Sequence, residues 1–177
     1  MSRLKPDVSE ADHRAGSDDA PVTLVEYGDY ECPHCGRAHL IVGQVQKALG
    51  ERLRFVFRNF PLSEMHPHAV RAAEAAEAAA AQGKFWEMHD LLYEHQNALD
   101  DGHLLQYAKR LGLDVEIFQR ELVTGARSDR VKSDFRSGVR SGVNGTPTYF
   151  INGRRLDGPS DYEGLMAAIE RAGTGGK

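Results

Sequence analysis

The stretch EYGDYECPHC, residues 26–35, contains both cysteines of this 177-residue chain, Cys32 and Cys35. A disulfide between cysteines three positions apart closes a very small ring. Loop-closure entropy gives such a bond only about 2 kcal/mol of stabilising effect, which makes it a poor structural staple. We therefore interpret the Cys32-Pro33-His34-Cys35 motif as a redox-active pair that changes between dithiol and disulfide.

The residues on either side of this motif predict a strand, a helix and a second strand. The segment VTLVEY (22–27) is rich in β-branched and aromatic residues, which is typical of a buried strand. Apolar residues recur at helical spacing over 36–49, and Gly50 is placed to end that helix. Residues 53–58 alternate as in a second strand. Both cysteines are then expected on the first turn of a helix that joins two parallel strands.

The rest of the chain predicts a helical block followed by a hairpin and a last helix. Residues from about 67 to 142 carry only helical signals, with glycines between the periodic segments. The segment TPTYFI (146–151) predicts a strand, and Asn152-Gly153 predicts a two-residue turn into an antiparallel partner. A last helix is expected to begin near residues 159–161. Residues 1–20 are polar without period, which indicates a flexible arm or a strap over the surface.

The position of the motif assigns a role to each of its residues. Unpaired N–H groups and the positive dipole end of a helix favour a thiolate, so Cys32 is the predicted nucleophile. Cys35, one turn further in, is predicted to resolve the mixed disulfide. Pro33 fixes the backbone at the helix start, while His34 can donate a hydrogen bond or positive charge toward the Cys32 sulfur. Because a stabilised thiolate stabilises the reduced form, we expect an oxidant rather than a reductant.

Composition narrows the class of protein and its surroundings. With 41% hydrophobic residues, 27% charged residues and a net charge of −4, the chain is typical of a soluble globular protein with no affinity for nucleic acid. Its apolar runs are too short for the roughly 20 residues of a membrane span. No signal-peptide core is present in the first twenty residues. We therefore expect a cytoplasmic protein as the sequence stands, or a periplasmic or extracytoplasmic one if a leader was removed.

The stretch 26–35, the segment GVNGTPTYF (142–150) and the order of elements together resemble the DsbA family of the thioredoxin superfamily. The resemblance implies an α/β, thioredoxin-like fold, with a central mixed sheet built as β-α-β and then β-β-α. An all-helical insertion separates the two halves. The expected parts are a flexible N-terminal arm (1–20), a thioredoxin-like domain (21–66 and 143–177) and the helical insertion (67–142).

The same resemblance implies roles for residues outside the motif. Pro147 would be a cis-proline that faces the disulfide, and the Thr146 backbone would offer strand-like hydrogen bonds to a bound client segment. Glu26, six residues before Cys32, would be a buried acid that assists proton transfer at Cys35. Without the resemblance, Glu26 could be an ordinary strand residue and Pro147 a trans proline on an edge strand.

A zinc site is the alternative use of a CxxC pair, with nitrogen ligands from His34, His39, His66 or His68. Structural zinc normally needs two ligand pairs at set spacings, and the sequence has no second cysteine pair. We therefore predict no metal, and we expect most of the eight histidines to lie at the surface.

These observations predict a protein thiol-disulfide oxidoreductase that passes the Cys32–Cys35 disulfide to client dithiols and uses no other cofactor. Its partners would be client proteins or peptides and a redox partner that resets the pair, and we expect a monomer. Two alternatives stay open, a cytoplasmic disulfide reductase or small-thiol exchanger, and a redox-independent peptide-binding or chaperone-like module. A disulfide isomerase is disfavoured because the length leaves no room for a separate dimerisation domain.

Overall fold

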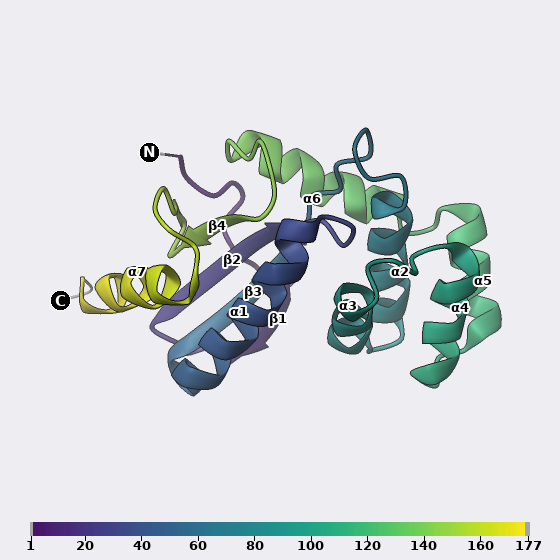
Figure 1. Cartoon of the computed structure of the whole chain (residues 1–177), viewed down its shortest axis with the longest axis horizontal. Helices are drawn as coiled ribbons and strands as arrows, with labels where there is room; N and C mark the ends of the chain where they lie inside the picture. Colours follow the sequence, from purple (N-terminus) through teal and green to yellow (C-terminus); the bar gives the residue numbers. More distant parts are fainter. Residues whose placement is uncertain (1, 176–177) are drawn as a thin grey trace. The chain divides into compact units, whose positions relative to one another are not determined.

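The computed structural model describes residues 2–175, which form a five-stranded sheet and seven α-helices (Figure 1). In chain order the elements are β1 (His13–Gly16), β2 (Val22–Gly28), α1 (Pro33–Leu49), the 3-10 turn η1 (Gly50–Arg52), β3 (Leu53–Asn59), α2 (Ala69–Ala81), α3 (Phe85–Glu94), α4 (Asp101–Arg110), α5 (Val115–Thr124), α6 (Ser128–Arg140), β4 (Thr148–Ile151), β5 (Arg154–Arg155) and α7 (Tyr162–Thr174). The central sheet and the helical segment between β3 and β4 confirm the predicted fold class.

The chain divides into two compact units. The first comprises Met1–Gly28, Arg37–Arg58 and Arg136–Lys177, and the second comprises Asp29–Gly36 and Asn59–Phe135. The sheet therefore belongs almost entirely to the first unit, whereas the CPHC motif belongs to the second. These bounds differ from the parts expected from the sequence, because the segment around the motif groups with the helical block.

The sheet of the first unit has the order β1-β3-β2-β4-β5. Strands β2 and β3, which α1 joins, are neighbours, and β4 runs antiparallel to both β2 and β5. The turn between β4 and β5 has positive φ at both central residues, 46° at Asn152 and 77° at Gly153. This is the backbone that a two-residue hairpin needs, which explains why asparagine and glycine stand there.

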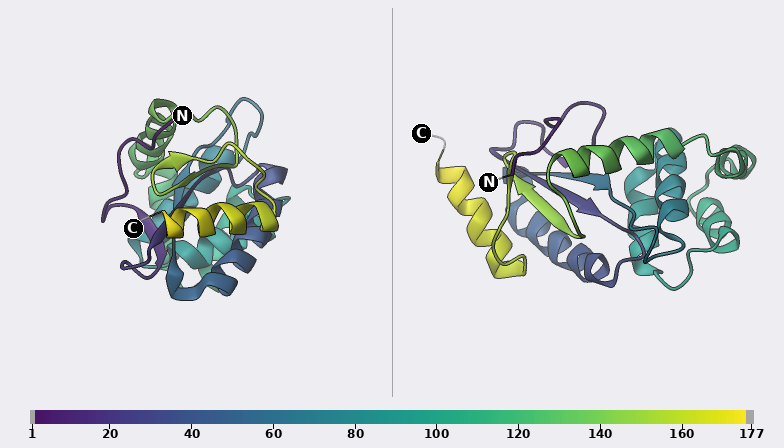
Figure 2. Two further views of the ribbon diagram at one scale, coloured as in Figure 1. Left: turned by 90° about the vertical axis from the view of Figure 1, so that its left-hand side faces the viewer. Right: turned by 90° about the horizontal axis from the view of Figure 1, so that it is seen from above.

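Helices α1 and α7 lie together on one face of this sheet (Figure 2). Val22 of β2, Leu49 of α1 and Ile169 of α7 are buried beside a shared hollow of about 390 Å³. Helix α7 begins where the sequence predicts, because the Asp161 side chain accepts a hydrogen bond from the Gly164 amide at 2.9 Å.

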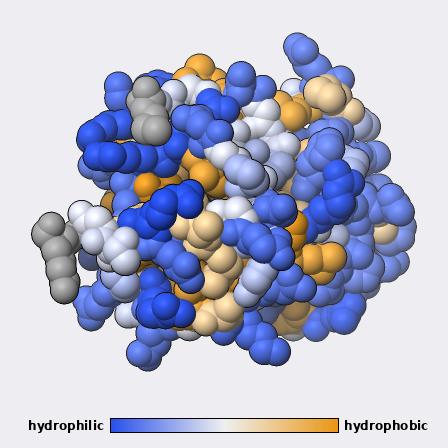
Figure 3. Space-filling view, turned by 60° about the vertical axis from the view of Figure 1, so that its left-hand side comes forward, coloured by the Kyte–Doolittle hydropathy of each residue, from blue (hydrophilic) through white to orange (hydrophobic). Residues whose placement is uncertain are grey.

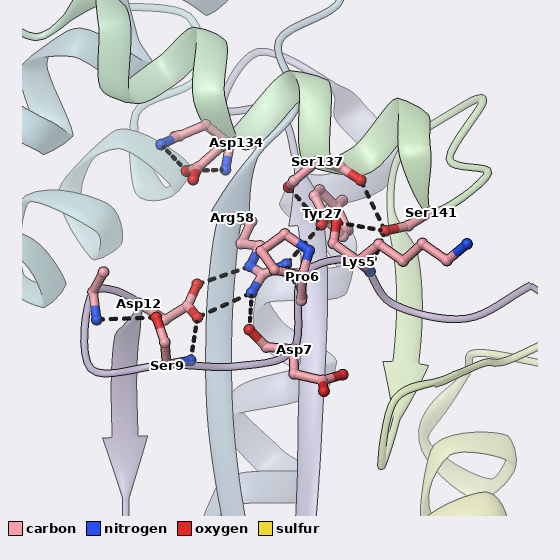
Figure 4. A network of polar contacts seen from close by, with 12 residues as sticks. Lys5, Pro6, Asp7, Ser9, Asp12, Tyr27, Arg58, Asp134, Ser137 and Ser141 are labelled. Atoms are coloured by element: carbon pink, nitrogen blue, oxygen red, sulfur yellow. Dashed lines mark hydrogen bonds and ion pairs between the residues drawn. The ribbon is translucent and has the colours of Figure 1, made fainter.

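The N-terminal segment is tied to the sheet by buried polar contacts (Figure 4). The Arg58 guanidinium binds the Asp12 carboxylate through two bonds of 2.8 and 3.0 Å, and it also donates to the Pro6 carbonyl and the Tyr27 hydroxyl. Strand β1 then pairs antiparallel with β3. The segment 1–20, expected as a flexible arm or a strap over the surface, therefore includes a strand, which backbone pairing and a buried ion pair hold to the sheet.

The second unit is built around α2, whose alanines are buried almost all round the helix. Small side chains let neighbouring helices approach closely, and α3, α4 and α5 all pack against α2. Two acids of α2 are buried with polar partners: Glu77 accepts from the side-chain Nδ2 of Asn59 at 2.8 Å and Glu74 from the Ser128 hydroxyl at 2.6 Å. The helices α2 to α6 lie within residues 67–142, the block for which the sequence predicts only helices.

Polar and charged side chains cover most of the face seen in Figure 3, with apolar side chains in scattered groups. Among the helices of residues 2–175, none combines the length and the apolar character needed to cross a bilayer.

Candidate active site

The CPHC motif lies at the start of α1, with its two thiols buried and its two central residues exposed. Cys32 is 4% exposed and Cys35 0%, while Pro33 and His34 face solvent. Helix α1 begins at Pro33, and the Cys32 carbonyl accepts the Gly36 amide at 3.1 Å. Cys32 is therefore the residue that caps the helix, one position before the first turn on which we expected it. This position keeps Cys32 at the positive end of the helix dipole, as the thiolate argument requires.

Asp29 organises the turn that precedes α1. Its side chain is 0% exposed, and Oδ1 accepts hydrogen bonds from the amides of Glu31 at 2.8 Å and Cys32 at 3.2 Å. Its second oxygen, Oδ2, accepts from the Leu62 amide at 2.9 Å and from His66 Nδ1 at 2.8 Å. One buried carboxylate thus fixes the backbone of the nucleophile to the segment that follows β3.

His66 is the imidazole partner of this carboxylate, and its side chain is only 15% exposed. Burial lowers the pKa of His66, but the hydrogen bond to Asp29 and the negative charges of Asp29, Cys32 and Glu31 outweigh it and raise the pKa above its usual value. The expectation that most histidines lie at the surface does not hold for this residue. Folding therefore shifts the titration of His66 toward the imidazolium, next to the turn that carries Cys32.

A second acid and histidine pair lies beside the first. Glu31 Oε2 accepts from the His68 amide at 2.6 Å, and Oε1 accepts from His68 Nδ1 at 2.9 Å. The His68 side chain is 48% exposed, so this pair is open to solvent, unlike Asp29 and His66. His66 and His68 are two of the four histidines considered in the zinc alternative, and here Nδ1 of each binds a carboxylate.

Gln96 secures the carbonyl side of the same turn. Its Nε2 donates to the carbonyls of Tyr30 and Cys32, each at 2.9 Å. The Tyr30 side chain is itself buried, and its hydroxyl binds His89 Nδ1 at 2.9 Å. Gly36 is needed for this arrangement, because a Cβ at that position would collide with the Gln96 side chain.

A cleft of about 440 Å³ opens beside the exposed Pro33. Its walls are mostly polar side chains together with one leucine: Glu31, Pro33, His68, Gln96, Asn97, Leu99 and Asp100. It offers hydrogen-bonding groups next to the motif, on the edge of the helical block.

The other predicted site residues belong to the first unit. Glu26 lies on β2, 2% exposed, opposite Tyr149 of β4. Its burial agrees with the buried acid that the family resemblance implies, and its part in proton transfer stays a prediction. Thr146 and Pro147 precede β4, and the peptide bond between them is cis. The trans alternative for Pro147 is therefore wrong.

The sequence profile of a thioredoxin family, described simply as thioredoxin, matches residues 8–171. The chain belongs to the thioredoxin family. Among solved structures, oxidised BdbD from Bacillus subtilis is 26% identical, with a TM-score of 0.86 over 98% of both chains. A thioredoxin-like oxidoreductase from Silicibacter pomeroyi is 29% identical, with a TM-score of 0.81 over 93% of both chains. The thiol-disulfide exchange protein α-DsbA2 from Wolbachia pipientis, 21% identical, shares the fold over 92% of this chain and 88% of its own, with a TM-score of 0.77.

A curated relative of this thioredoxin-family chain carries a different name. The Na⁺/H⁺ antiporter NhaA 3 of Salinispora tropica is 48% identical over 163 residues, which are 92% of this chain and 25% of the relative. The chain thus spans about a quarter of the length of the curated relatives it matches. The solved structures confirm the resemblance to DsbA-like members of the thioredoxin superfamily.

Sequence reasoning assigned no role to Asp29 or Gln96, and it considered His66 only as a ligand in the zinc alternative. All three residues bind the turn before α1 or its partners in this thioredoxin-family chain. The one local signal is an aspartate three residues before Cys32, because aspartate side chains often accept backbone amides a few residues on. No local pattern connects that aspartate to His66, which follows 37 residues later.

Proposed function

We propose that this chain oxidises dithiols in client proteins through the Cys32–Cys35 disulfide. One observation carries the proposal: in a thioredoxin-family chain similar to thiol-disulfide oxidoreductases, Cys32 caps α1 and Cys35 is fully buried one turn further in. The helix end stabilises the Cys32 thiolate, and burial shields Cys35 from other thiols. The sulfur that reaches a client is then Cys32.

The reaction needs two exchange steps. A client thiolate attacks the Cys32 sulfur, the Cys32–Cys35 bond breaks, and Cys35 leaves as a thiolate that takes up a proton. A second client thiolate attacks the client sulfur of this mixed disulfide and releases Cys32 as a thiolate. The client loses two electrons and gains a disulfide, and the enzyme gains the two electrons as a dithiol. If no second client thiolate attacks, the Cys35 thiolate attacks the Cys32 sulfur instead, which re-forms the Cys32–Cys35 disulfide and releases the client as a thiolate.

Residues around the pair support these steps. Pro33 holds the helix start and the exposed His34 offers a hydrogen bond or charge to the Cys32 thiolate. We assign to Glu26 the proton transfer at Cys35, and to Thr146 and Pro147 the binding of an extended client segment. The cleft beside Pro33 would receive client side chains that flank the reactive cysteine.

Trapping tests the proposal against the redox-independent binding module. A Cys35→Ser variant should accumulate mixed disulfides with clients through Cys32, and a Cys32→Ser variant should not. Removal of both cysteines should abolish client oxidation. Client binding that survives unchanged without either cysteine, with no trapped species, would reject the enzyme in favour of the module.

The direction of electron flow is tested by the reduction potential and by melting. A potential near the cytosolic glutathione poise would support a reductase or small-thiol exchanger and reject a dedicated oxidase. For an oxidase, the reduced protein should melt above the oxidised one near pH 7. The reason is that thiolate stabilisation is present above the unfolded thiol pKa of about 8.5 and is lost only as pH falls through the lower folded value.

The antiporter relatives favour a second candidate function, a redox domain that serves a membrane ion transporter. The test is to replace the matching quarter of the Salinispora tropica antiporter with this chain and to measure Na⁺/H⁺ exchange in vesicles. Exchange that changes between dithiol and disulfide conditions, and no longer does so after Cys32→Ser, supports the candidate. Exchange that is indifferent to redox state rejects it.

Compartment and oligomeric state stay predictions. Cell fractionation distinguishes a cytoplasmic from a periplasmic or extracytoplasmic location, and sedimentation of the purified chain tests whether it is a monomer.

A further inference from the structure

We propose that His66 is a positioning residue for the reactive thiol: it balances the buried Asp29 carboxylate that holds the Cys32 amide, and it thereby keeps Cys32 in the thiolate form. The inference rests on the proposed function, since it concerns the nucleophile of that reaction. His66 touches the site through Asp29, and it follows the motif by more than thirty residues in the chain.

The charge of the Asp29 carboxylate lies next to the nucleophile. Oδ1 lies 3.2 Å from the Cys32 nitrogen, in a side chain with no solvent exposure. A carboxylate so near the amide of the nucleophile opposes a second negative charge on the Cys32 sulfur, and water cannot screen the repulsion. Asp29 alone would therefore disfavour the thiolate, although it caps the same turn.

A protonated His66 compensates the Asp29 charge. His66 Nδ1 binds the other Asp29 oxygen at 2.8 Å, and the imidazole is itself mostly buried. The titratable groups that act on His66 from the surrounding segments are Asp29, Cys32 and Glu31, and all three are acids that favour the imidazolium. With His66 protonated, the Asp29–His66 pair is neutral, and the helix end can act on the thiolate unopposed.

The His68–Glu31 pair in the same loop is a matched comparison for the His66–Asp29 pair. His68 also binds an acid through Nδ1, at 2.9 Å, but its partner Glu31 is not bonded to the Cys32 amide. The His68 side chain is 48% exposed, against 15% for His66. Exposed charge pairs are screened by water, so loss of the His68 charge should act only weakly on Cys32.

The experiment compares His66→Asn with His68→Asn, each in a Cys35→Ser background, so that thiolate absorbance reports Cys32 alone. Asparagine keeps a side-chain N–H donor near the Nδ1 position but carries no charge. We expect His66→Asn to raise the pKa of Cys32 by about one unit, a tenfold loss of thiolate below that pKa, and His68→Asn to raise it by less than about a third of a unit. Equal shifts, or no shift in a folded His66→Asn protein, would overturn the proposal.

Reciprocity gives a second test that leaves His66 in place. If Cys32 and His66 are coupled, then Cys32→Ser must lower the pKa of His66 by the amount that the His66 charge lowers the pKa of Cys32. An NMR titration of the imidazole measures it, and an unchanged His66 pKa overturns the inference even if His66→Asn fails to fold. With both cysteines present, the potential of His66→Asn should be about 30 mV more reducing, which is the tenfold change in exchange constant.

The two proposals fail in different ways. Absent client oxidation by the wild-type protein removes the proposed function, whereas the pKa of Cys32 remains measurable. Normal client oxidation with a Cys32 pKa that is indifferent to His66 removes the inference alone.

Discussion

The backbone N–H of Cys32 donates to Asp29 Oδ1 at 3.2 Å, so a carboxylate with no solvent exposure holds the nucleophile in place. The same side chain accepts from three further donors, one in the turn before α1 and two in the segment that follows β3. Asp29→Ala would remove the acceptor of three partly buried donors, the Glu31 amide, the Leu62 amide and His66 Nδ1, and each such group costs about 1 kcal/mol or more. We expect the free energy of unfolding to fall by about 3 kcal/mol in urea titrations. Alanine at the exposed Glu64 serves as control, and a loss no larger than that of Glu64→Ala would contradict the role of Asp29.

Two glycines of α1 make a matched pair of substitutions. A Cβ at Gly36 would collide with Gln96, which holds the carbonyls of Tyr30 and Cys32, whereas a Cβ at Gly43 meets nothing within 4 Å. Gly36→Ala should lower the melting temperature and slow client oxidation, because Gln96 must leave its place. Gly43→Ala should stabilise the protein by about 0.5–1 kcal/mol, the usual gain of alanine over glycine in a helix. A Gly36→Ala protein as stable as Gly43→Ala would show that Gln96 adapts at no cost.

Local sequence patterns predicted the elements that local chemistry determines. The hairpin follows from asparagine and glycine at two positive-φ positions, and the start of α7 follows from an aspartate that caps it. The buried cysteines at the start of α1 follow from the motif and from the apolar period after it. Each of these features depends on residues a few positions apart, so a short stretch of the sequence is enough to predict it.

Contacts between segments that are distant in the chain could not be predicted from local sequence patterns. Strand β1, with the sequence HRAG, has no β-branched or aromatic residue, and it forms because β3 offers backbone partners. The convergence of Asp29 and His66 depends on how the loop after β3 returns to the motif, which no periodicity encodes. Sequence reasoning therefore found the reactive pair and missed the polar residues that hold it.

The raised pKa of His66 predicts a pH dependence of stability. Burial lowers this pKa, but the Asp29 hydrogen bond and nearby acids raise it above the unfolded value of about 6.5. A group whose pKa is raised on folding contributes stability that is fully present below the unfolded pKa and is lost as pH rises through the folded pKa. The difference in unfolding free energy between wild type and His66→Asn should therefore be largest below about pH 6.5 and shrink above it. A difference that stays constant across this range would show that His66 does not gain a proton on folding.

The Arg58–Asp12 pair should dominate the attachment of the N-terminal segment. Both side chains are nearly buried, at 3% and 7% exposure, and although burial lowers the pKa of Arg58, its bonds to Asp12 and Tyr27 keep that pKa above the usual value. Asp12→Ala leaves a buried guanidinium without its carboxylate, which costs about 3–5 kcal/mol. Asp18→Ala breaks a more exposed pair with Arg14 and should cost less than about 1 kcal/mol. Hydrogen exchange should then show loss of protection in β1 for Asp12→Ala alone, because the pair fixes the segment that leads into that strand (Figure 4). Equal protection of β1 in both variants would mean that backbone pairing with β3 suffices without the ion pair.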